Sequence, residues 1–226
     1  KKRKLTLNGL FGKHDKAVCV PVQNPHIAYF YKAYGAVNYD AVSGKGFETY
    51  FNKKEEIELT NITIKMAKLN NVEILNSNLE NNTFMDTEFD NCNFSNTSFN
   101  SSSFIRCKFR NCKFTGCNFS ESGICNTQFE ECNLVYINWS MSNIKNVLFK
   151  KSIMRSDIFQ ENKFKKVEFK ESDLTQAQFF NTSLKNIDLS NSIIEGIAIS
   201  VDDIKGAIIS EMQAIDLISL LGVKIK

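Results

Sequence analysis

The sequence predicts an all-β solenoid, in which short strands stack coil upon coil, and two observations support this fold class. Every fifth residue is apolar from Leu59 through Ile209. A period of five matches neither the 3.6 residues per turn of a helix nor the two-residue alternation of a strand, so it indicates a structural repeat. The only two prolines, Pro21 and Pro25, precede this region, as expected if every rung donates backbone hydrogen bonds to its neighbours.

A second column of residues, two positions before the apolar one, holds mostly small side chains. One large and one small inward residue per five, with polar residues between them, predicts a short rung that turns a corner at every repeat. The small residues of this column are Ala67, Ser77, Thr87, Cys92, Thr97, Ser102, Cys107, Cys112, Cys117, Ser122, Thr127 and Cys132.

These units resemble the repeats of the pentapeptide-repeat family, whose consensus A(D/N)LXX also accepts Phe at its centre. The segments "CNFSN", "CKFRN", "CKFTG", "CNFSE", "SDLTQ" and "IDLSN" carry the match. The resemblance covers residues 57–209 and implies a right-handed quadrilateral parallel β-helix with four pentapeptides per coil. Residues 20 apart would then stack, and the repeats from Leu59 to Ile209 would make nearly eight coils.

The cysteines are expected to be small core residues rather than ligands. Cys107, Cys112 and Cys117 fall at the small inward position, and their spacing of five differs from the paired spacing of zinc ligands. Both histidines lie outside the repeat, so we expect no metal and no cofactor. Only Cys125 is predicted to face outward.

The composition indicates a soluble, cytoplasmic protein. The chain has seven cysteines, an odd number, and shows neither a secretory signal pattern nor an apolar run of about 18 residues. These features favour free thiols in a reducing compartment and argue against a membrane protein.

Stacking at 20 residues also predicts how charges are arranged on the surface. Most columns alternate in sign, as in the series Asp90, Arg110, Glu130, Lys150 and Lys170, which avoids repulsion between coils. One column instead places an apolar stripe before stacked lysines, and we take its members as candidates for binding a protein partner: Met85, Ile105, Lys145, Lys165 and Lys185, with Lys65 and Cys125 in the same column. An acidic patch is the second candidate surface: Glu73, Glu80, Asp86, Glu88 and Asp90.

The coil at residues 144–163 breaks the pattern. Leu148, Ile153 and Ile158 are apolar at outward positions, and Asp157 falls at an inward one. The coil either slips in register, which would place Ser156 and Ile158 inside, or presents an apolar belt. We favour the slip, because an unpaired buried carboxylate is costly.

The C-terminal residues 210–226 predict a helix followed by a short strand. Ser210 and Gln213 form a capping box, and Gly222 suits the end of the helix. The segment "QAIDLISLLGVKI" is similar to the terminal cap of the quinolone-resistance and gyrase-inhibiting pentapeptide proteins, which implies a homodimer joined through this cap. The expected interface is Met212, Ile215, Leu217, Ile218 and Leu221, and the alternative is a plain monomeric cap.

The N-terminal residues 1–56 differ from the repeat in composition. Asn24 followed by Pro25 suits the start of a helix, and Gly35 suits its end. We expect a small mixed subdomain that covers the first coil, with a separate binding role as the alternative.

No catalytic set of residues, phosphate-binding loop or metal spacing is found in the sequence, so we expect a non-enzymatic rod that acts as a dimeric or self-assembling scaffold. The family resemblance implies a bacterial protein whose specific partner is DNA gyrase or another type II topoisomerase. The alternative is a DNA mimic that inhibits gyrase or protects it from quinolones, although such mimics are strongly acidic and this chain has a net charge of +3. We expect neither a small-molecule substrate nor direct DNA binding, since outward aromatic residues rarely accompany the lysines.

Overall fold

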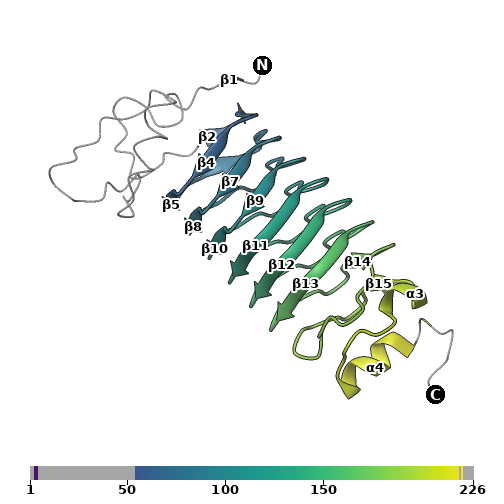
Figure 1. Cartoon of the computed structure of the whole chain (residues 1–226). Helices are drawn as coiled ribbons and strands as arrows, with labels where there is room; N and C mark the ends of the chain where they lie inside the picture. The colour runs from purple at the N-terminus through teal and green to yellow at the C-terminus, as the bar shows by residue number, and fades with distance from the viewer. Residues whose placement is uncertain (1–2, 5–53, 219, 221–226) are drawn as a thin grey trace.

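In the computed structural model, which describes residues 3–4, 54–218 and 220, the chain forms a parallel β-solenoid that ends in two short helices (Figure 1). The expectations for the N-terminal subdomain fall outside the described residues. The strands are β1 (Arg3–Lys4), β2 (Lys54–Glu55), β3 (Ile57–Glu58), β4 (Thr63–Lys65), β5 (Lys68–Asn70), β6 (Ile74–Leu75), β7 (Thr83–Met85), β8 (Glu88–Asp90), β9 (Ser103–Ile105), β10 (Lys108–Arg110), β11 (Gly123–Glu130), β12 (Asn143–Lys150), β13 (Lys163–Lys170), β14 (Gln178–Phe179) and β15 (Ala198–Ile199). The helices are α3 (Val201–Ile204) and α4 (Glu211–Ile218).

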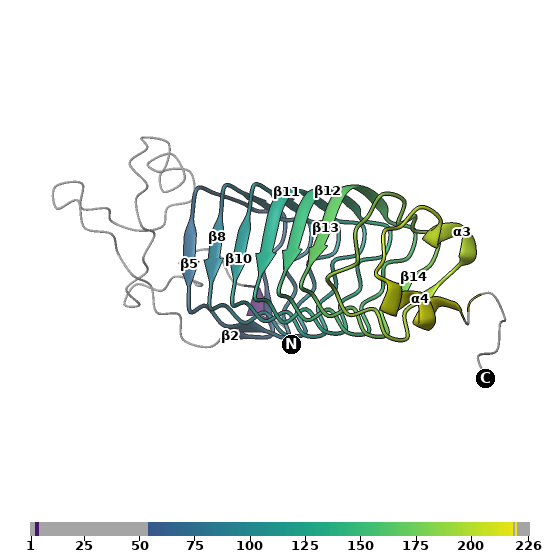
Figure 2. The same ribbon diagram turned by 90° about the horizontal axis from the view of Figure 1, so that it is seen from below.

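The predicted 20-residue register is confirmed along the solenoid. Phe109 pairs in parallel with Phe89 in the preceding coil and with Phe129 in the next. Nine strands, β4, β5 and β7 to β13, join into one sheet that runs along the rod, and Figure 2 shows the coils side by side with α3 and α4 at one end. The solenoid has about seven turns, and the expected rung around Ile204 is formed by the short helix α3.

The core consists of the two predicted inward columns. The central residues from Leu59 to Ile199 are buried, except that Leu69 and Phe164 are half-buried. Phenylalanine rings 20 residues apart stack with their centroids 4.5 to 5.2 Å apart, in the range that favours aromatic pairs. The stacked rings of one column are Phe89, Phe109, Phe129, Phe149 and Phe169.

The small inward residues fasten one coil to another. The hydroxyl of Ser102 accepts a hydrogen bond from the backbone N–H of Asn82 at 3.1 Å and donates to the carbonyl of Leu79 at 3.1 Å. Cys107 donates through its thiol to the carbonyl of Phe84 in the same way. These residues therefore satisfy backbone groups that the turning of each corner leaves buried.

Each corner of the solenoid requires a left-handed backbone conformation. Every fifth residue from Glu56 to Asn186 has a φ between +50° and +70°. Asparagine tolerates this region better than most residues and occupies many of the corners, whereas Tyr136 and Met141 adopt it against their own preference. The corner residues point their side chains outward, which leaves Tyr136 and Met141 exposed.

The predicted register slip at residues 144–163 is wrong. Asp157 stays at the inward position and is fully buried, and Ser156 lies at the corner with a φ of 56°. The carboxylate is not left unpaired, because one oxygen accepts from the N–H of Ile137 at 2.8 Å and the other from the indole N–H of Trp139 at 3.0 Å. The outward apolar residues follow from this register, and Ile153 is 41% exposed.

Burial raises the pKa of Asp157 well above its ordinary value, and the hydrogen bonds from Trp139 and Ile137 oppose this shift only in part. Asn82 shows how a neutral group fits the small inward position of a repeat on another face of the solenoid. Its Oδ1 accepts from the N–H of Ile62, and its Nδ2 donates to the carbonyl of Leu59. A neutral side chain at such a position thus satisfies backbone groups of the preceding coil.

The aromatic core predicts a large cost for removing a buried ring. Phe114→Ala should lower the free energy of unfolding by about 3–5 kcal/mol, because the ring is fully buried and its loss leaves a cavity. Phe180→Ala is the matched control, since the Phe180 side chain is 43% exposed and should cost far less. Denaturant unfolding followed by circular dichroism measures both, and equal losses would contradict the assigned core.

The raised pKa of Asp157 predicts a pH-dependent stability. Between the ordinary carboxyl pKa of about 3.9 and the higher folded pKa, the folded state holds a proton that the unfolded state has lost, so stability falls as pH rises. In Asp157→Asn this dependence should disappear, and the stability of the variant relative to wild type should rise by up to about 1.4 kcal/mol per pH unit in that window.

Urea unfolding at several pH values between 4 and 8 tests this expectation. The control is Asp188→Asn, because hydrogen bonds from Ser190 lower the pKa of Asp188, and stability from that group is lost as pH falls. A pH-independent difference between Asp157→Asn and wild type would show that the buried carboxyl has an ordinary pKa.

Candidate interaction surfaces

The predicted mixed column lies along one line of the solenoid. Strand pairing connects its members at every step from Lys65 to Lys165, and Lys185 follows 20 residues later. Met85 and Ile105 are half-buried, whereas the lysines are exposed. After Lys65, the column is therefore divided into an apolar part toward the N-terminal end of the rod and a cationic part toward the C-terminal end.

The cationic part contains more exposed lysines than the sequence analysis predicted. Lys163 and Lys166 lie on the same coil as Lys165, both exposed, and were missed because only the single column was considered. The signal was present in the segment "NKFKKVEFK", where four lysines lie within eight residues. We call the following five exposed side chains the lysine patch: Lys145, Lys163, Lys165, Lys166 and Lys185.

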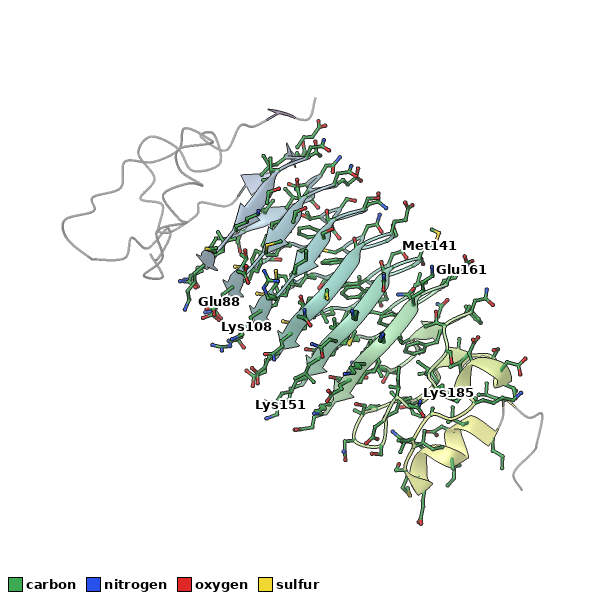
Figure 3. All side chains as sticks on the ribbon, in the orientation of Figure 1. Glu88, Lys108, Met141, Lys151, Glu161 and Lys185 are labelled. Atoms are coloured by element: carbon green, nitrogen blue, oxygen red, sulfur yellow. The ribbon has the colours of Figure 1, made fainter. Side chains whose placement is uncertain are left out.

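The lysine patch is not neutralised by the rest of the described chain. The ion pairs found among residues 54–218 include none of its five members. Stacked lysines about 5 Å apart repel one another, so this arrangement favours an anionic partner. Figure 3 shows Lys185 near the C-terminal end of the rod, where the patch ends.

The structure does not bring the five predicted acidic residues into one patch. Glu73 precedes one buried central residue and Glu80 follows the next, so they lie on rungs away from the corner that carries Asp86, Glu88 and Asp90. The three residues at that corner are close in space, but the remaining two belong to other faces of the rod.

The acidic residues at the corner are largely paired with basic residues one coil away. Arg106 donates to both oxygens of Asp86, at 2.5 and 2.8 Å, and this contact lowers the pKa of that carboxyl. Glu88 lies between Lys68 and Lys108 in the strand register, with Lys68 at 3.7 Å, and Figure 3 shows Glu88 and Lys108 side by side. Charges of opposite sign therefore alternate from coil to coil in this column as well, and they leave little uncompensated negative charge here.

The C-terminal helix α4 closes the end of the solenoid. The predicted capping box is present, because the Ser210 N–H donates to the side-chain oxygen of Gln213 at 2.8 Å and the Gln213 N–H donates back to the Ser210 hydroxyl at 3.4 Å. The amide nitrogen of Gln213 is buried and donates to the carbonyls of Leu189 and Ser192, at 2.8 and 2.6 Å. The same residue therefore starts the helix and anchors it to the last coil.

The predicted interface residues of the cap differ in exposure. Met212 is 77% exposed and Ile215 is 57% exposed. Leu217 instead packs against the core, Ile218 is half-buried, and Leu221 lies outside the described residues. One side of α4 thus covers the solenoid, and the other side presents apolar side chains.

The cysteines occupy the places that the sequence predicts. All six of the described cysteines are free thiols, and five of them are buried, whereas Cys125 is half-buried at the surface. Burial raises the pKa of the Cys107 thiol to about 12, so it stays protonated and inert. Within the described part of the chain, no group of three or more His, Cys, Asp or Glu side chains is placed to hold a metal ion. None of the described helices is long and apolar enough to cross a bilayer.

Comparison with known proteins agrees with this architecture. Residues 82–155 match the family model of the pentapeptide repeat region. The matched residues therefore resemble a pentapeptide repeat region, and in this structure they form coils of the β-solenoid. No curated protein sequence matches the chain.

Solved structures with some likeness include two pentapeptide-repeat proteins. A trypsin-treated form of QnrB1, a plasmid-mediated fluoroquinolone resistance protein, is 20% identical with a TM-score of 0.41, over 77% of this chain and 92% of its own. HetL, involved in heterocyst differentiation regulation in the cyanobacterium Nostoc sp. strain PCC 7120, is 13% identical with a TM-score of 0.25, over 83% of this chain and 98% of its own.

The anchoring role of Gln213 predicts that the cap loosens without it. Gln213→Ala leaves the carbonyls of Leu189 and Ser192 without their donor, which should cost about 1–3 kcal/mol. Hydrogen exchange of the α4 amides should then become faster, while exchange in the middle of the solenoid stays unchanged. Met212→Ala is the control, since its exposed side chain makes no anchoring contact, and equal loosening in both variants would contradict the role of Gln213.

Proposed function

We propose that this protein is a non-enzymatic interaction rod that forms a homodimer through α4 and presents its sides to a protein partner. The observation that supports the dimer most is that the two sides of α4 have different surroundings. Its inner side is fastened to the last coil by Gln213 and Leu217, while Met212 and Ile215 on the other side are exposed.

Further apolar side chains lie at the same end of the rod. Val201 in α3 and Ile208 just before α4 are also exposed. Apolar side chains that gather at one end of a molecule mark an interaction site, and a second copy of the same end is a complementary partner because like surfaces meet about a two-fold axis. The similarity of this segment to the caps of quinolone-resistance and gyrase-inhibiting proteins supports the same arrangement.

We propose DNA gyrase as the specific partner, because the sequence similarity of the cap points to the gyrase-binding members of the family. The structure favours contact through paired charges and exposed apolar residues over a DNA-mimic mode. A DNA mimic needs a continuous acidic face, whereas here Asp86 is paired with Arg106 and Glu130 with Lys150.

Placing a charge on the exposed side of α4 should prevent dimerisation. The double variant Met212→Glu and Ile215→Glu is expected to be monomeric at concentrations where wild type is dimeric, as measured by size exclusion with light scattering. These positions are better suited than Leu217, whose half-buried side chain supports the cap itself. Met141→Glu is the matched control, because Met141 is 55% exposed on the side of the rod and should leave the dimer intact.

A wild-type chain that is monomeric at every concentration would contradict the dimer, and so would a dimer that persists in the double variant.

The gyrase proposal predicts a direct effect on supercoiling. Micromolar protein should either inhibit supercoiling by purified DNA gyrase or reduce the inhibition caused by a fluoroquinolone. Because acidic side chains such as Asp86 and Glu130 are paired, the effect should survive a large excess of linear DNA, which would displace a DNA mimic. Normal supercoiling and undiminished drug sensitivity at micromolar protein would exclude gyrase as the partner.

A further inference from the structure

One face of the solenoid carries two columns of outward side chains along the rod. Strands β4, β7, β9, β11, β12 and β13 lie side by side in Figure 1, and each presents one outward residue on either side of a central residue that points inward. The residue after the central one belongs to the mixed column described above. The residue before it belongs to a second column, which we call the flanking column: Thr83, Ser103, Gly123, Asn143, Lys163 and Ser183. The two columns together are called the side strip.

The part of the side strip toward the N-terminal end of the rod is uncharged and largely apolar. Met85, Ile105 and Cys125 are half-buried, and strand pairing stacks them on consecutive coils. The flanking column beside them holds threonine, serine and glycine, so its side chains are small. A partner can therefore approach the sheet closely here and cover the apolar side chains.

The part of the side strip toward the C-terminal end is cationic. Lys145 pairs with Lys165 in the strand register, Lys185 follows one coil later, and Lys163 adds an ammonium group in the flanking column. All four lysines are exposed, and none of them takes part in an ion pair in the described part of the chain. Neither column contains an acidic residue on these coils or on the three preceding ones.

Two carboxylates lie at the margins of the cationic part. Glu168 forms an ion pair with Lys170 at 2.5 Å, on the next face of the solenoid. Glu161 lies at the corner before Lys163 and accepts a hydrogen bond from the side chain of Gln160 at 3.2 Å. A negatively charged partner that crossed the rod would meet both carboxylates, whereas one that lies along the rod axis avoids them.

The carboxylates beyond Lys185 also have partners. Asp202 forms an ion pair with Lys205 at 2.6 Å, and Asp203 accepts from the hydroxyl of Ser200 at 2.7 Å. The cationic part therefore ends at α3, and the acidic part of a partner faces three coils that carry lysines.

The spacing along the mixed column favours a helix over an extended strand. Consecutive coils are about 4.8 Å apart, so its last three lysines span about 9.6 Å and the length from Met85 to Lys185 is about 24 Å. Helix residues spaced alternately by three and four share one face and advance by about 4.5 and 6 Å, so they stay within about 2 Å of the column over six coils. Alternate residues of a strand advance by about 6.7 Å and are displaced by about 4 Å over three lysines.

The two parts of the side strip also distinguish between kinds of anionic partner. A nucleic-acid backbone would contact the lysines but would leave Met85 and Ile105 uncovered. The two columns contain no aromatic residue from Thr83 to Lys185 on which a base could stack. A peptide helix with apolar and acidic residues on one face covers both parts.

We propose that the side strip binds an amphipathic helix of a partner protein that lies along the rod axis. One face of this helix carries three apolar residues that cover the apolar part of the mixed column, followed by three acidic residues that meet its lysines. The helix advances in the same direction as the coils, so the partial negative charge of its carboxyl end also lies at the lysines. The site extends the proposed interaction rod but involves neither α4 nor gyrase, so either proposal can fail without the other.

A designed peptide tests this proposal. The probe is an acetylated and amidated peptide of 20 residues, made of alanine and glutamine except for leucine at positions 1, 4 and 8 and glutamate at positions 11, 15 and 18. The full chain should bind it in a fluorescence titration at low ionic strength, and Lys145→Glu with Lys165→Glu should weaken binding by about tenfold or more. Lys108→Glu with Lys113→Glu is the matched control, because both lysines are exposed outside the side strip.

Equal affinities in the two double variants would contradict the assigned charges, and so would a failure of wild type to bind the probe at millimolar concentration. A charge-swapped probe separates lost contact from a folding defect. With lysine in place of its three glutamates, the probe should bind Lys145→Glu with Lys165→Glu more tightly than it binds wild type. Weaker binding to the double variant than to wild type would overturn the pairing.

A single substitution tests the apolar part of the site. Ile105→Ser should weaken binding of the original probe by about fivefold or more, because the contact with an apolar side chain is lost. Ile153→Ser is the control, since Ile153 is an exposed isoleucine outside the side strip. Equal affinity in these two variants would show that the apolar part takes no part in binding.

Two further probes distinguish a helix from other occupants. A peptide with two interior alanines of the original probe replaced by proline cannot form a continuous helix, and it should bind about tenfold more weakly. A single-stranded oligonucleotide should also bind more weakly than the original probe. Equal binding by the proline peptide would favour an extended segment, tighter binding by the oligonucleotide would favour a nucleic acid, and either result would overturn the proposal.

Discussion

The structure depends on one constraint, which is that backbone groups of each coil must meet those of the next at a separation of 20 residues. Strand pairs, isolated bridges and hydroxyl contacts all follow this separation. To keep it, the chain must turn a corner every five residues, and it does so with a left-handed residue at each corner. Each such residue costs backbone energy, roughly 1–2 kcal/mol for most side chains, so the paired rungs and the buried rings must together outweigh that cost.

The same constraint determines which residues can form a surface site. Side chains 20 apart form columns, so a binding surface on the rod is a property of spacing and not of neighbouring sequence. The lysine patch forms because Lys145, Lys165 and Lys185 share a column, whereas Glu73 and Glu80 lie near Asp86 in sequence but on other faces. Surfaces that remain unpaired occur at the cap, where the ladder stops, and along the cationic part of the side strip.

The period of five was sufficient to predict much of the fold. It identified the central column, the small column and the inward cysteines, and the capping box at Ser210 and Gln213 followed from local helix chemistry. The environment of Asp157 could not be predicted in this way. Its buried carboxyl group receives a hydrogen bond from the indole of Trp139, and a repeat pattern does not contain such a contact between side chains of different coils.

The interaction surfaces were predicted less completely than the fold. The sequence analysis considered only residues 20 apart, so it identified Lys165 but missed Lys163 and Lys166, which lie beside Lys165 on the same coil. Both outward residues of a rung belong to the same surface, so a binding surface on the rod spans two columns.

The most direct test of this account is a set of distances along the rod measured between paired spin labels by electron paramagnetic resonance. In a chain with Cys19 and Cys125 replaced by serine, labels at positions 65 and 145 are four coils apart, and labels at 65 and 185 are six coils apart. At about 4.8 Å per coil the account predicts separations near 19 and 29 Å. Distances that do not increase with the number of coils would contradict the 20-residue solenoid on which every other conclusion depends.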